Sequence, residues 1–437
     1  MLLRPTCNIF APVKLNPLKR IITAVIVLLA CSAAARAQQA GRCDGRTADD
    51  EHYVIILSMD AFRWDLPQRC HTPTLDSLRR VGVFAETYPV FPANTFPNHY
   101  SMATGLHPDR HNIVNNGFYD RSVGREMSVF KHSDTATPGF WGGDPIWNTA
   151  ERQGRTAHIY MWPGSDIEIG GRQASIWTRY TDEPSYFERA DWVVASMCGE
   201  AADGRIPNLV MWYFEEPDAV MHEYGPDSDE IIPTIEHIDS ALAYFFREIR
   251  RSPVFDRINF IVTADHGMAQ LSKERYINLN GALDERHIVR VVSGRPLGIE
   301  VDEEYLDTAV EIIDRIGHIK AYKRDSMPEK WHYGTNRNRI TNLLVVPDNG
   351  WTVEYADCDK PRDGGTHGFD PFERDMHTVF YASGPMFRKG YEQRSFQNLN
   401  IYLVLCHLLG IEPSPNDGCW EDVCGMFAEG ETQPDAE

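Results

Sequence analysis

The feature that most constrains the fold of this 437-residue chain is an alternation of short apolar runs with segments of helical periodicity. The apolar runs of strand length lie at 53–58, 208–214, 258–263 and 378–383. Helical periods cover residues 72–81 and 231–249. Runs that are apolar at every position are typical of strands buried on both faces. The alternation therefore predicts an α/β fold with a mostly parallel central sheet and helices on both faces.

The charge balance limits the partners of the chain. It carries 63 acidic and 43 basic residues, a formal net charge of −20. Because phosphate backbones are bound by basic surfaces, we expect no stable nucleic-acid partner. The chain could still bind a small phosphate-bearing substrate, since bound metal cations can invert the local field of an acidic protein.

The first forty residues have the features of an export signal. Basic residues precede a ten-residue apolar run at 21–30, and A-R-A at 35–37 is a small-x-small cleavage site. Such a run is too short to span a bilayer and is typical of a signal-peptide core. We predict a signal peptide at 1–37 and a periplasmic, cell-envelope or secreted protein without a transmembrane span in its mature form. The alternatives are a membrane anchor and a lipid anchor at Cys31, which follows a loose lipobox.

No linker or repeat divides the rest of the chain. We expect a flexible entry at 38–50, a single domain at 51–426 and a disordered acidic tail at 427–437. Seven cysteines follow the predicted signal peptide, and export permits disulfides. Cys419 and Cys424 are close enough in sequence to bridge, and the odd total leaves at least one cysteine free or paired between chains.

Metal-ligating side chains follow three of the predicted strands. Asp60 follows the first strand, Asp218 the second, and Asp265 with His266 the third. Because ligands bind beyond the carboxyl ends of strands in open α/β sheets, we expect these side chains to converge. A lone aspartate at a strand end is usually a helix cap or turn former, but a run of such features favours a metal site.

Two further histidines extend this set. His222 lies four residues after Asp218, which places both side chains on one helix face, although such a pair is often only a surface pair. His367 lies in the glycine-rich segment GGTHG, whose backbone can bend sharply. A mixture of aspartate and histidine ligands suits zinc.

Thr95 is the candidate nucleophile. It lies in the proline-flanked turn FPANTFPNH before a helical stretch, where the helix N-terminus favours anions. A threonine hydroxyl needs a metal or a base to remove its proton. The alternative is that Thr95 only caps the helix. We interpret the nearby His99, His107 and His111 as structural or surface residues.

Five segments carry a family resemblance. They are LSMDAFRWD, FPANTFPNHYSMATGLHPDRHNIVNN, EEPDAVMHEYGP, TADHGM and GGTHGF. In this order and spacing the chain resembles the nucleotide pyrophosphatase/phosphodiesterase family of the alkaline-phosphatase superfamily, from about residue 53 to about residue 424. The resemblance implies an alkaline-phosphatase-like α/β/α sandwich in a compact form that consists of the catalytic domain alone.

The resemblance also implies a site with two zinc ions per chain. The implied ligands are Asp218, His222 and His367 for one zinc, and Asp60, Asp265, His266 and Thr95 for the other. Thr95 is then the nucleophile, and Asn116 donates to a phosphate oxygen. The implied reaction is hydrolysis of phosphodiester and pyrophosphate bonds of nucleotides or their derivatives through a phospho-threonine, with release of nucleoside 5'-monophosphates.

Aromatic side chains near these segments suggest the substrate. Aromatic faces stack on bases at about 1–3 kcal/mol per base. We predict Tyr180, Phe96 and Trp162 as substrate-binding residues, and the WPGSD segment and the full stretch after Asn116 resemble nucleotide-hydrolysing members. The alternative for such aromatics is the core, and it is the favoured one for Trp212 and Phe214.

Other functions stay open at this stage. The alternatives within the superfamily are a lysophospholipid or choline-phosphate phosphodiesterase and a phosphomonoesterase. A phosphomonoesterase usually supplies an arginine to its dianionic phosphate, and no arginine adjoins Thr95. The non-enzymatic alternative is a binding module on an inactive scaffold, and the complete ligand set argues against it.

Overall fold

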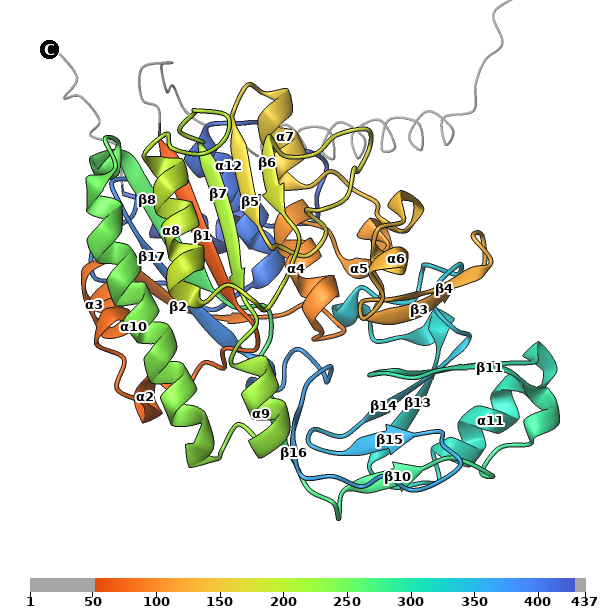
Figure 1. Cartoon of the computed structure of the whole chain (residues 1–437). Helices are drawn as coiled ribbons and strands as arrows, with labels where there is room; N and C mark the ends of the chain where they lie inside the picture. The colour runs from red at the N-terminus through yellow and green to blue at the C-terminus, as the bar shows by residue number, and fades with distance from the viewer. Residues whose placement is uncertain (1–51, 429–437) are drawn as a thin grey trace, which may run out of the picture. The chain divides into compact units, whose positions relative to one another are not determined.

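The central sheet of the computed structural model, which describes residues 52–428, has nine strands (Figure 1). Eight of them lie in the order β18-β2-β17-β8-β1-β7-β5-β6, and β19 pairs with β2. Their bounds are β1 (Tyr53–Met59), β2 (Val83–Tyr88), β5 (Ala157–Tyr160), β6 (Ile176–Thr178), β7 (Leu209–Phe214), β8 (Ile258–Thr263), β17 (Thr378–Ser383), β18 (Tyr391–Glu392) and β19 (Phe396–Gln397). The four predicted strands are confirmed as β1, β7, β8 and β17. Only β17 runs antiparallel to its neighbours, so the sheet is mostly parallel as predicted.

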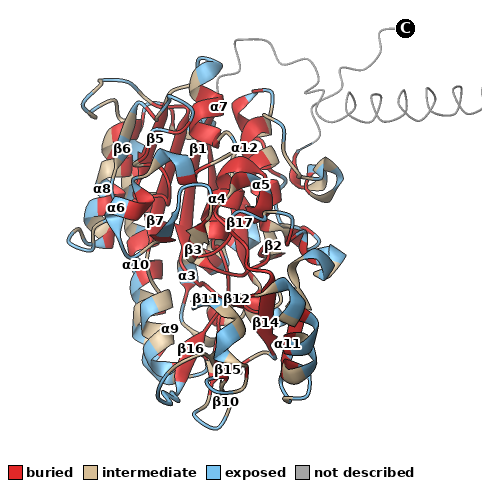
Figure 2. Ribbon diagram, turned by 90° about the vertical axis from the view of Figure 1, so that its right-hand side faces the viewer, coloured by how far each residue is buried: buried red, intermediate tan, exposed pale blue. Residues whose placement is uncertain are grey.

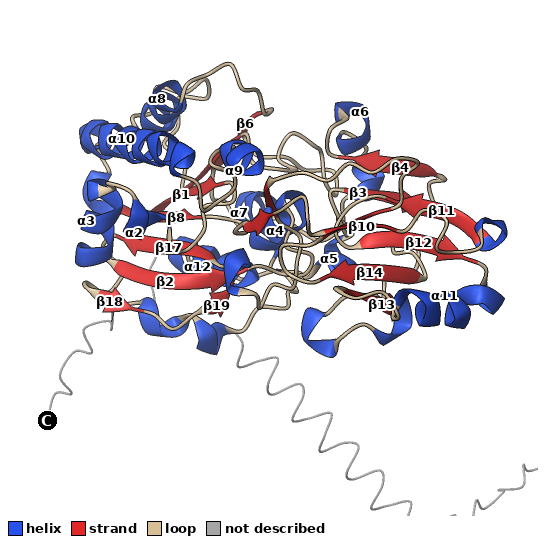
Figure 3. Ribbon diagram, turned by 90° about the horizontal axis from the view of Figure 1, so that it is seen from below, coloured by secondary structure: helices blue, strands red, loops and turns tan. Residues whose placement is uncertain are grey.

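Helices cover both faces of this sheet (Figure 3). On one face lie α3 (Pro73–Val81), α8 (Tyr186–Met197) and α10 (Ile232–Glu248), and on the other α4 (Thr95–Thr104), α7 (Ile146–Arg152) and α12 (Ile401–Leu409). Side chains alternate between the faces, so Ile55 of β1 joins the core under α3, α8 and α10, whereas Ile56 joins the opposite core. The predicted helices are confirmed as α3 and α10, and the α/β/α sandwich is confirmed with them.

A second sheet, here called the small sheet, was not anticipated from the sequence. It is antiparallel, in the order β11-β12-β14-β13, and helix α11 (Leu306–Ile313) packs on it (Figure 1). Its strands are β11 (Ile288–Val292), β12 (Leu297–Val301), β13 (Ile319–Lys323) and β14 (Leu343–Pro347). A separate hydrophobic cluster that includes Ile299, Ile313 and Val345 holds it together.

Short elements connect the two sheets and border the site. The paired strands are β3 (Gly117–Asp120) with β4 (Arg125–Ser128), β9 (Ala269–Leu271) with β16 (Gly364–Thr366), and β10 (Tyr276–Asn278) with β15 (Thr352–Glu354). The short helices are α2 (Leu66–Arg69), α5 (Pro108–His111), α6 (His132–Thr135) and α9 (Asp218–Tyr224). Figure 2 shows buried residues along the central strands and exposed ones on the outer helices. Within residues 52–428, no helix is both long and apolar enough to cross a bilayer.

The predicted ends of the chain have different outcomes. The signal peptide, Cys31 and the entry at 38–50 lie outside the described residues, as does 429–437. Phe427 was assigned to a disordered tail, and this is wrong, because its ring is 9% exposed and stacks with Phe387 and Trp420 at centroid distances of 5.5 Å.

The suggested disulfide is also not present. Cys419 and Cys424 are free thiols, and the Sγ of Cys419 donates to a carboxylate oxygen of Glu421. Cys70, Cys198 and Cys358 are free as well.

Candidate active site

Three aspartates meet at one edge of the central sheet. The strands β1, β7 and β8 are adjacent and parallel, so the residues that follow their carboxyl ends share this edge. Asp60 follows β1, Asp218 opens helix α9 after β7, and Asp265 follows β8. The backbone N–H of Ala61 donates to Asp265 Oδ1 at 3.0 Å, which ties two of these strand ends together.

Three histidines lie at this edge, and each is oriented by a contact between its Nδ1 atom and a backbone carbonyl. The Nδ1 atoms of His222, His266 and His367 lie 2.9, 2.9 and 3.0 Å from the carbonyl oxygens of Gly365, Gly267 and Ala93. Nδ1–H donation to a carbonyl fixes the tautomer and leaves Nε2 free as a ligand atom. Burial lowers the pKa of all three imidazoles, to about 4 for His222, so the rings are neutral at neutral pH and able to bind a cation.

The glycine-rich segment brings the last histidine into place. Gly364 has a φ of +102°, and a Cβ atom at this position would lie 2.3 Å from the carbonyl oxygen of His222. Only glycine allows β16 to approach α9 this closely. The ring of His367 therefore stacks on that of His266 with a centroid distance of 3.8 Å.

The ligand atoms form two overlapping groups. His222 Nε2 lies 3.3 Å from Asp218 Oδ2, and His367 Nε2 lies 3.7 Å from Asp218 Oδ1. These three residues match the first predicted set. The second group that falls within 4.8 Å is Asp60, His266 and Asp218, whereas the prediction had Asp265 in place of Asp218. Asp265 still adjoins this group, because its Oδ2 lies 3.2 Å from His266 Nε2.

The carboxylates offer oxygen atoms that could hold a cation. Oδ1 of Asp60, Oδ1 of Asp218 and Oδ2 of Asp265 are buried without a hydrogen-bond partner among the described residues. Burial, and then repulsion by Asp265, raises the pKa of Asp60 and of Asp218 well above the usual range. Burial also opposes ionisation of Asp265, but His266 and His99 outweigh it and hold its pKa at about 2. Three clustered carboxylates that each have one buried oxygen without a donor favour a cation, and carboxylate with imidazole is a donor set that suits zinc.

Thr95 lies at this cluster. It is the first residue of α4, and its Oγ1 lies 3.1 Å from His266 Nε2. The alternative that Thr95 caps the helix is wrong, because Asn94 occupies the N-cap position. The hydroxyl is partly exposed, beside the helix N-terminus and the ligand atoms.

Asn116 and two predicted aromatic residues border the same space. Asn116 Oδ1 accepts a hydrogen bond from the backbone N–H of Phe96 at 3.0 Å, which leaves its Nδ2 as the atom that can donate to a ligand. The side chain of Phe96 is partly buried, with its ring 6.3 Å from that of Trp141. Tyr180 is 46% exposed, and its ring lies 5.9 Å from that of Tyr213, whose hydroxyl donates to Asp60.

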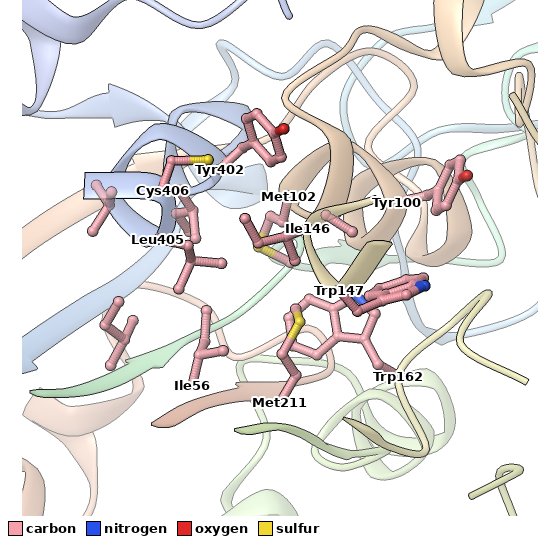
Figure 4. Packing of buried hydrophobic residues seen from close by; sticks show 14 of the residues in the cluster. Ile56, Tyr100, Met102, Ile146, Trp147, Trp162, Met211, Tyr402, Leu405 and Cys406 are labelled. Atoms are coloured by element: carbon pink, nitrogen blue, oxygen red, sulfur yellow. The ribbon is translucent and has the colours of Figure 1, made fainter. Parts of the chain in front are cut away.

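The prediction of Trp162 as a substrate-binding residue is wrong. Its side chain is 1% exposed, and its Nε1–H donates to the carbonyl oxygen of His99 at 3.1 Å. Figure 4 shows it among buried residues that include Trp147 and Met211. A ring covered in this way has no free face for a base.

Two further residues position the ligands: Tyr213, whose role was not predicted, and His99, which was interpreted as structural or surface and is buried. The hydroxyl of Tyr213 donates to Asp60 Oδ2 at 2.5 Å, which turns Oδ1 of this carboxylate toward His266. His99 is fully buried, and its Nδ1 lies 3.0 Å from the carbonyl oxygen of Thr95 and 3.3 Å from Asp265 Oδ2. Side-chain alternation along β7 separates Tyr213 from the core residues Trp212 and Phe214, and this could have indicated it.

Comparisons with known proteins agree with this geometry. Residues 54–370 match the family model described as type I phosphodiesterase / nucleotide pyrophosphatase. The chain is 33% identical over 378 residues to human ectonucleotide pyrophosphatase/phosphodiesterase family member 5, which covers 86% of this chain and 78% of the relative. It is 33% identical over 368 residues to the Xenopus laevis bis(5'-adenosyl)-triphosphatase enpp4, which covers 84% and 79%.

A solved structure extends the comparison to the fold. It is murine ectonucleotide pyrophosphatase/phosphodiesterase 5, in an inactive form with one threonine replaced by alanine and in complex with AMP. Its TM-score is 0.81 at 31% identity, and the match covers 86% of this chain and all of the murine one.

Proposed function

Because the chain belongs to the type I phosphodiesterase/nucleotide pyrophosphatase family, we propose that it hydrolyses phosphodiester and pyrophosphate bonds of nucleotides and releases nucleoside 5'-monophosphates. The observation that carries this proposal is the clustering of three carboxylates, each with one buried oxygen that has no donor, with the Nε2 atoms of three histidines, one of which contacts the hydroxyl of Thr95. The AMP bound to the murine neighbour and the triphosphatase name of the Xenopus relative support a nucleotide substrate.

We propose two zinc ions per chain as the cofactor. The residues that would hold them are Asp218, His222 and His367 for one, and Asp60, Asp265, His266 and Thr95 for the other, with Asp218 also within reach of the second. Bound zinc would supply a Lewis acid that polarises phosphoryl oxygens and lowers the pKa of oxygen ligands. It would also give an acidic chain the positive field that a phosphate needs.

In the proposed mechanism Thr95 is the nucleophile. Its Oγ1 loses its proton to solvent and attacks phosphorus, the bond to the leaving oxygen breaks with its electron pair on that oxygen, and the nucleoside 5'-phosphoryl group stays on Thr95 as an esterified phospho-threonine. Water then cleaves this ester, which restores the hydroxyl and releases the nucleoside monophosphate. The backbone of the α4 N-terminus and Nδ2 of Asn116 would donate to the phosphoryl oxygens, and loss of one such donor typically costs about 10²–10³ in rate.

Two of the predicted aromatic residues would hold the base. Phe96 follows the nucleophile, and Tyr180 follows β6 at the carboxyl edge of the sheet, where it is exposed near Tyr213. A base stacked on Tyr180 would lie beside the metal ligands, which suits a nucleotide whose α-phosphate reaches Thr95.

We also propose that the enzyme acts outside the cytoplasm. The basic, apolar and small-residue pattern of residues 1–37 supports export, and the human relative carries the prefix ecto in its name. Lipid attachment at Cys31 is the alternative to a freely diffusing form.

The test separates the nucleophile from the metal ligands. Thr95→Ala should abolish turnover of p-nitrophenyl thymidine monophosphate, with zinc near two per chain by mass spectrometry, whereas Thr137→Ala, a partly exposed threonine outside the site, should keep activity. Native activity in Thr95→Ala would refute the assigned nucleophile. Faster turnover of p-nitrophenyl phosphate than of the diester by the native enzyme would favour a phosphomonoesterase, and a preference for lysophosphatidylcholine would favour the lipid phosphodiesterase.

A further inference from the structure

Arg295 lies between β11 and β12 of the small sheet, and its backbone is fastened to the loop that carries the nucleophile. Its carbonyl oxygen accepts hydrogen bonds from the Nδ2 atoms of Asn94 at 2.8 Å and Asn115 at 3.4 Å. These asparagines directly precede Thr95 and Asn116 in the sequence. The position of Arg295 is therefore coupled to that of the residues proposed to act on phosphate.

The side chain of Arg295 starts next to one group of candidate ligands. A Cβ atom added to Gly368 would lie 2.7 Å from the Cβ of Arg295, so the stem of the side chain packs against the backbone that follows His367. The positive charge of Arg295 contributes to lowering the pKa of both His222 and His367. Arg295 thus lies on the side of the site formed by these two histidines.

The guanidinium of Arg295 has no anionic partner. It is partly buried, its Nε is buried without a hydrogen-bond partner, and it forms no ion pair with a carboxylate in the part of the chain that the structure describes. Burial, and then repulsion by Arg362, lowers its pKa to about 10, so it stays charged at neutral pH. Glu354 favours this charge, but it forms no ion pair with Arg295.

The buried arginines of residues 52–428 all have the carboxylate partner that Arg295 lacks. Arg63 pairs with Asp65 and Asp227, Arg189 pairs with Glu215, and Arg339 pairs with Asp120.

Burial of the Nε of Arg295 and of part of its guanidinium removes hydration that no carboxylate replaces, although the chain carries 63 acidic residues. The missing partner of Arg295 is therefore best supplied by a ligand.

We propose that Arg295, with the exposed Arg362 beside it, binds the phosphate group of the substrate that lies beyond the broken bond. This inference rests on the proposed function. In an in-line displacement the attacking and leaving oxygens lie on opposite sides of phosphorus. Thr95 Oγ1 contacts His266, so the leaving group faces the side of His222, His367 and Arg295. A guanidinium matches phosphate geometry with two parallel hydrogen bonds.

The proposal makes Arg295 a specificity residue. Nucleotides whose leaving group carries phosphate, such as nucleoside triphosphates and dinucleoside polyphosphates, would give Arg295 its partner. Esters with an uncharged leaving group would leave it unpaired, and a site that leaves a buried polar group unpaired discriminates against such a substrate.

The test compares two ligands that differ only in the phosphates beyond the bond. Calorimetry on the zinc-loaded native enzyme and on Arg295→Met would measure the binding of α,β-methylene ATP, which resists cleavage, and of AMP. We expect Arg295→Met to weaken the ATP analogue by roughly 10–100-fold, as for loss of a hydrogen bond to a charged group, and AMP by less than about threefold. The affinity of Arg295→Lys for the ATP analogue should lie between those of the native enzyme and Arg295→Met. Arg362→Met should weaken binding of the analogue less, because Arg362 is exposed.

Kinetics give a second readout, which requires the proposed activity, whereas the calorimetry does not. The ratio of kcat/KM for ATP to that for p-nitrophenyl thymidine monophosphate should fall at least about tenfold in Arg295→Met. An equal loss for both ligands and both substrates, or no loss for the ATP analogue, would overturn the proposal. Loss of turnover in Thr95→Ala would still support the proposed function in either case. If Arg295→Met unfolds at a lower temperature than the native enzyme, Arg295→Lys allows the same comparison. Lysine keeps the positive charge but cannot form the two parallel hydrogen bonds of a guanidinium.

Discussion

The central sheet and the small sheet differ in construction and in what they bring to the site. All six residues of β8 are buried, whereas no residue of β11, at the edge of the small sheet, is buried. The central sheet is mostly parallel, and three of its adjacent strands end in Asp60, Asp218 and Asp265. The small sheet is antiparallel and contributes none of the candidate metal ligands, but it places Arg295 beside them.

This difference has a physical cause. In a parallel sheet the carboxyl ends of neighbouring strands share one edge, so ligands from distant parts of the chain meet there. In an antiparallel sheet neighbouring strands end at opposite edges, and only connecting segments reach a given site. We infer that the central sheet supplies the groups that carry out the reaction, whereas the small sheet influences which substrate is accepted. The following variants test that division.

The largest effect is expected at the shared ligand of the central sheet. Asp218→Asn removes a negative charge that belongs to both candidate metal groups. We expect bound zinc to fall below two per chain and kcat/KM on p-nitrophenyl thymidine monophosphate to fall roughly 10⁴-fold, as for loss of one member of a catalytic unit. The exposed Asp229→Asn is the matched control. Two tightly bound zinc ions together with near-native turnover would contradict the assignment.

A smaller effect, on stability rather than chemistry, is expected where the small sheet is attached. Arg339, just before β14, pairs with the buried Asp120 of β3 at 2.6 Å and donates to the carbonyl oxygens of Asn112 and Gly139. Arg339→Met leaves Asp120 buried and unpaired, so we expect the free energy of unfolding in urea to fall by about 3–5 kcal/mol.

The control for this attachment is an exposed ion pair nearby. Arg337→Met removes only the surface pair with Asp325 and should cost at most about 1 kcal/mol. At a temperature well below unfolding, the Arg339→Met enzyme should still turn over the p-nitrophenyl ester. Equal destabilisation by the two variants would show that the buried pair does not hold the sheets together.

The smallest effect is expected from the hydrogen bond that supports the candidate ligand Asp60. Tyr213→Phe removes the hydroxyl that donates to Asp60 Oδ2 and keeps the ring. Loss of such a supporting hydrogen bond typically costs about 10–100-fold in metal affinity, and we expect this loss in a zinc-chelator competition assay. Tyr244→Phe removes a hydroxyl that donates to Asp191 at the surface and should change nothing measurable. Unaltered zinc affinity in Tyr213→Phe would mean that Asp60 is held by its backbone alone.

Much of the fold and of the candidate site could be predicted because local patterns encode it. Continuous apolar runs specify buried strands, and the strands at 53–58 and 258–263 appear as β1 (Tyr53–Met59) and β8 (Ile258–Thr263). The residues after such strands meet for topological reasons, so the neighbourhood of Asp60 and Asp265 followed from their positions. The small sheet was not predicted because only β14 (LLVVP) is a continuous apolar run, whereas β11, β12 and β13 each contain a charged residue within the strand.

The sequence alone determined the chemistry on offer: the alternation that dictates a parallel sheet, the carboxylates and imidazoles at its strand ends, and the threonine at a helix start. Only the tertiary structure decided how these groups are used. In the folded chain Trp162 is buried in the core and Phe427 packs against other rings. The hydroxyl of Tyr213 donates to Asp60, and Arg295 has no carboxylate partner. The physical reason is that burial and pairing depend on contacts between residues far apart in the chain, and these exist only once the sheets have packed.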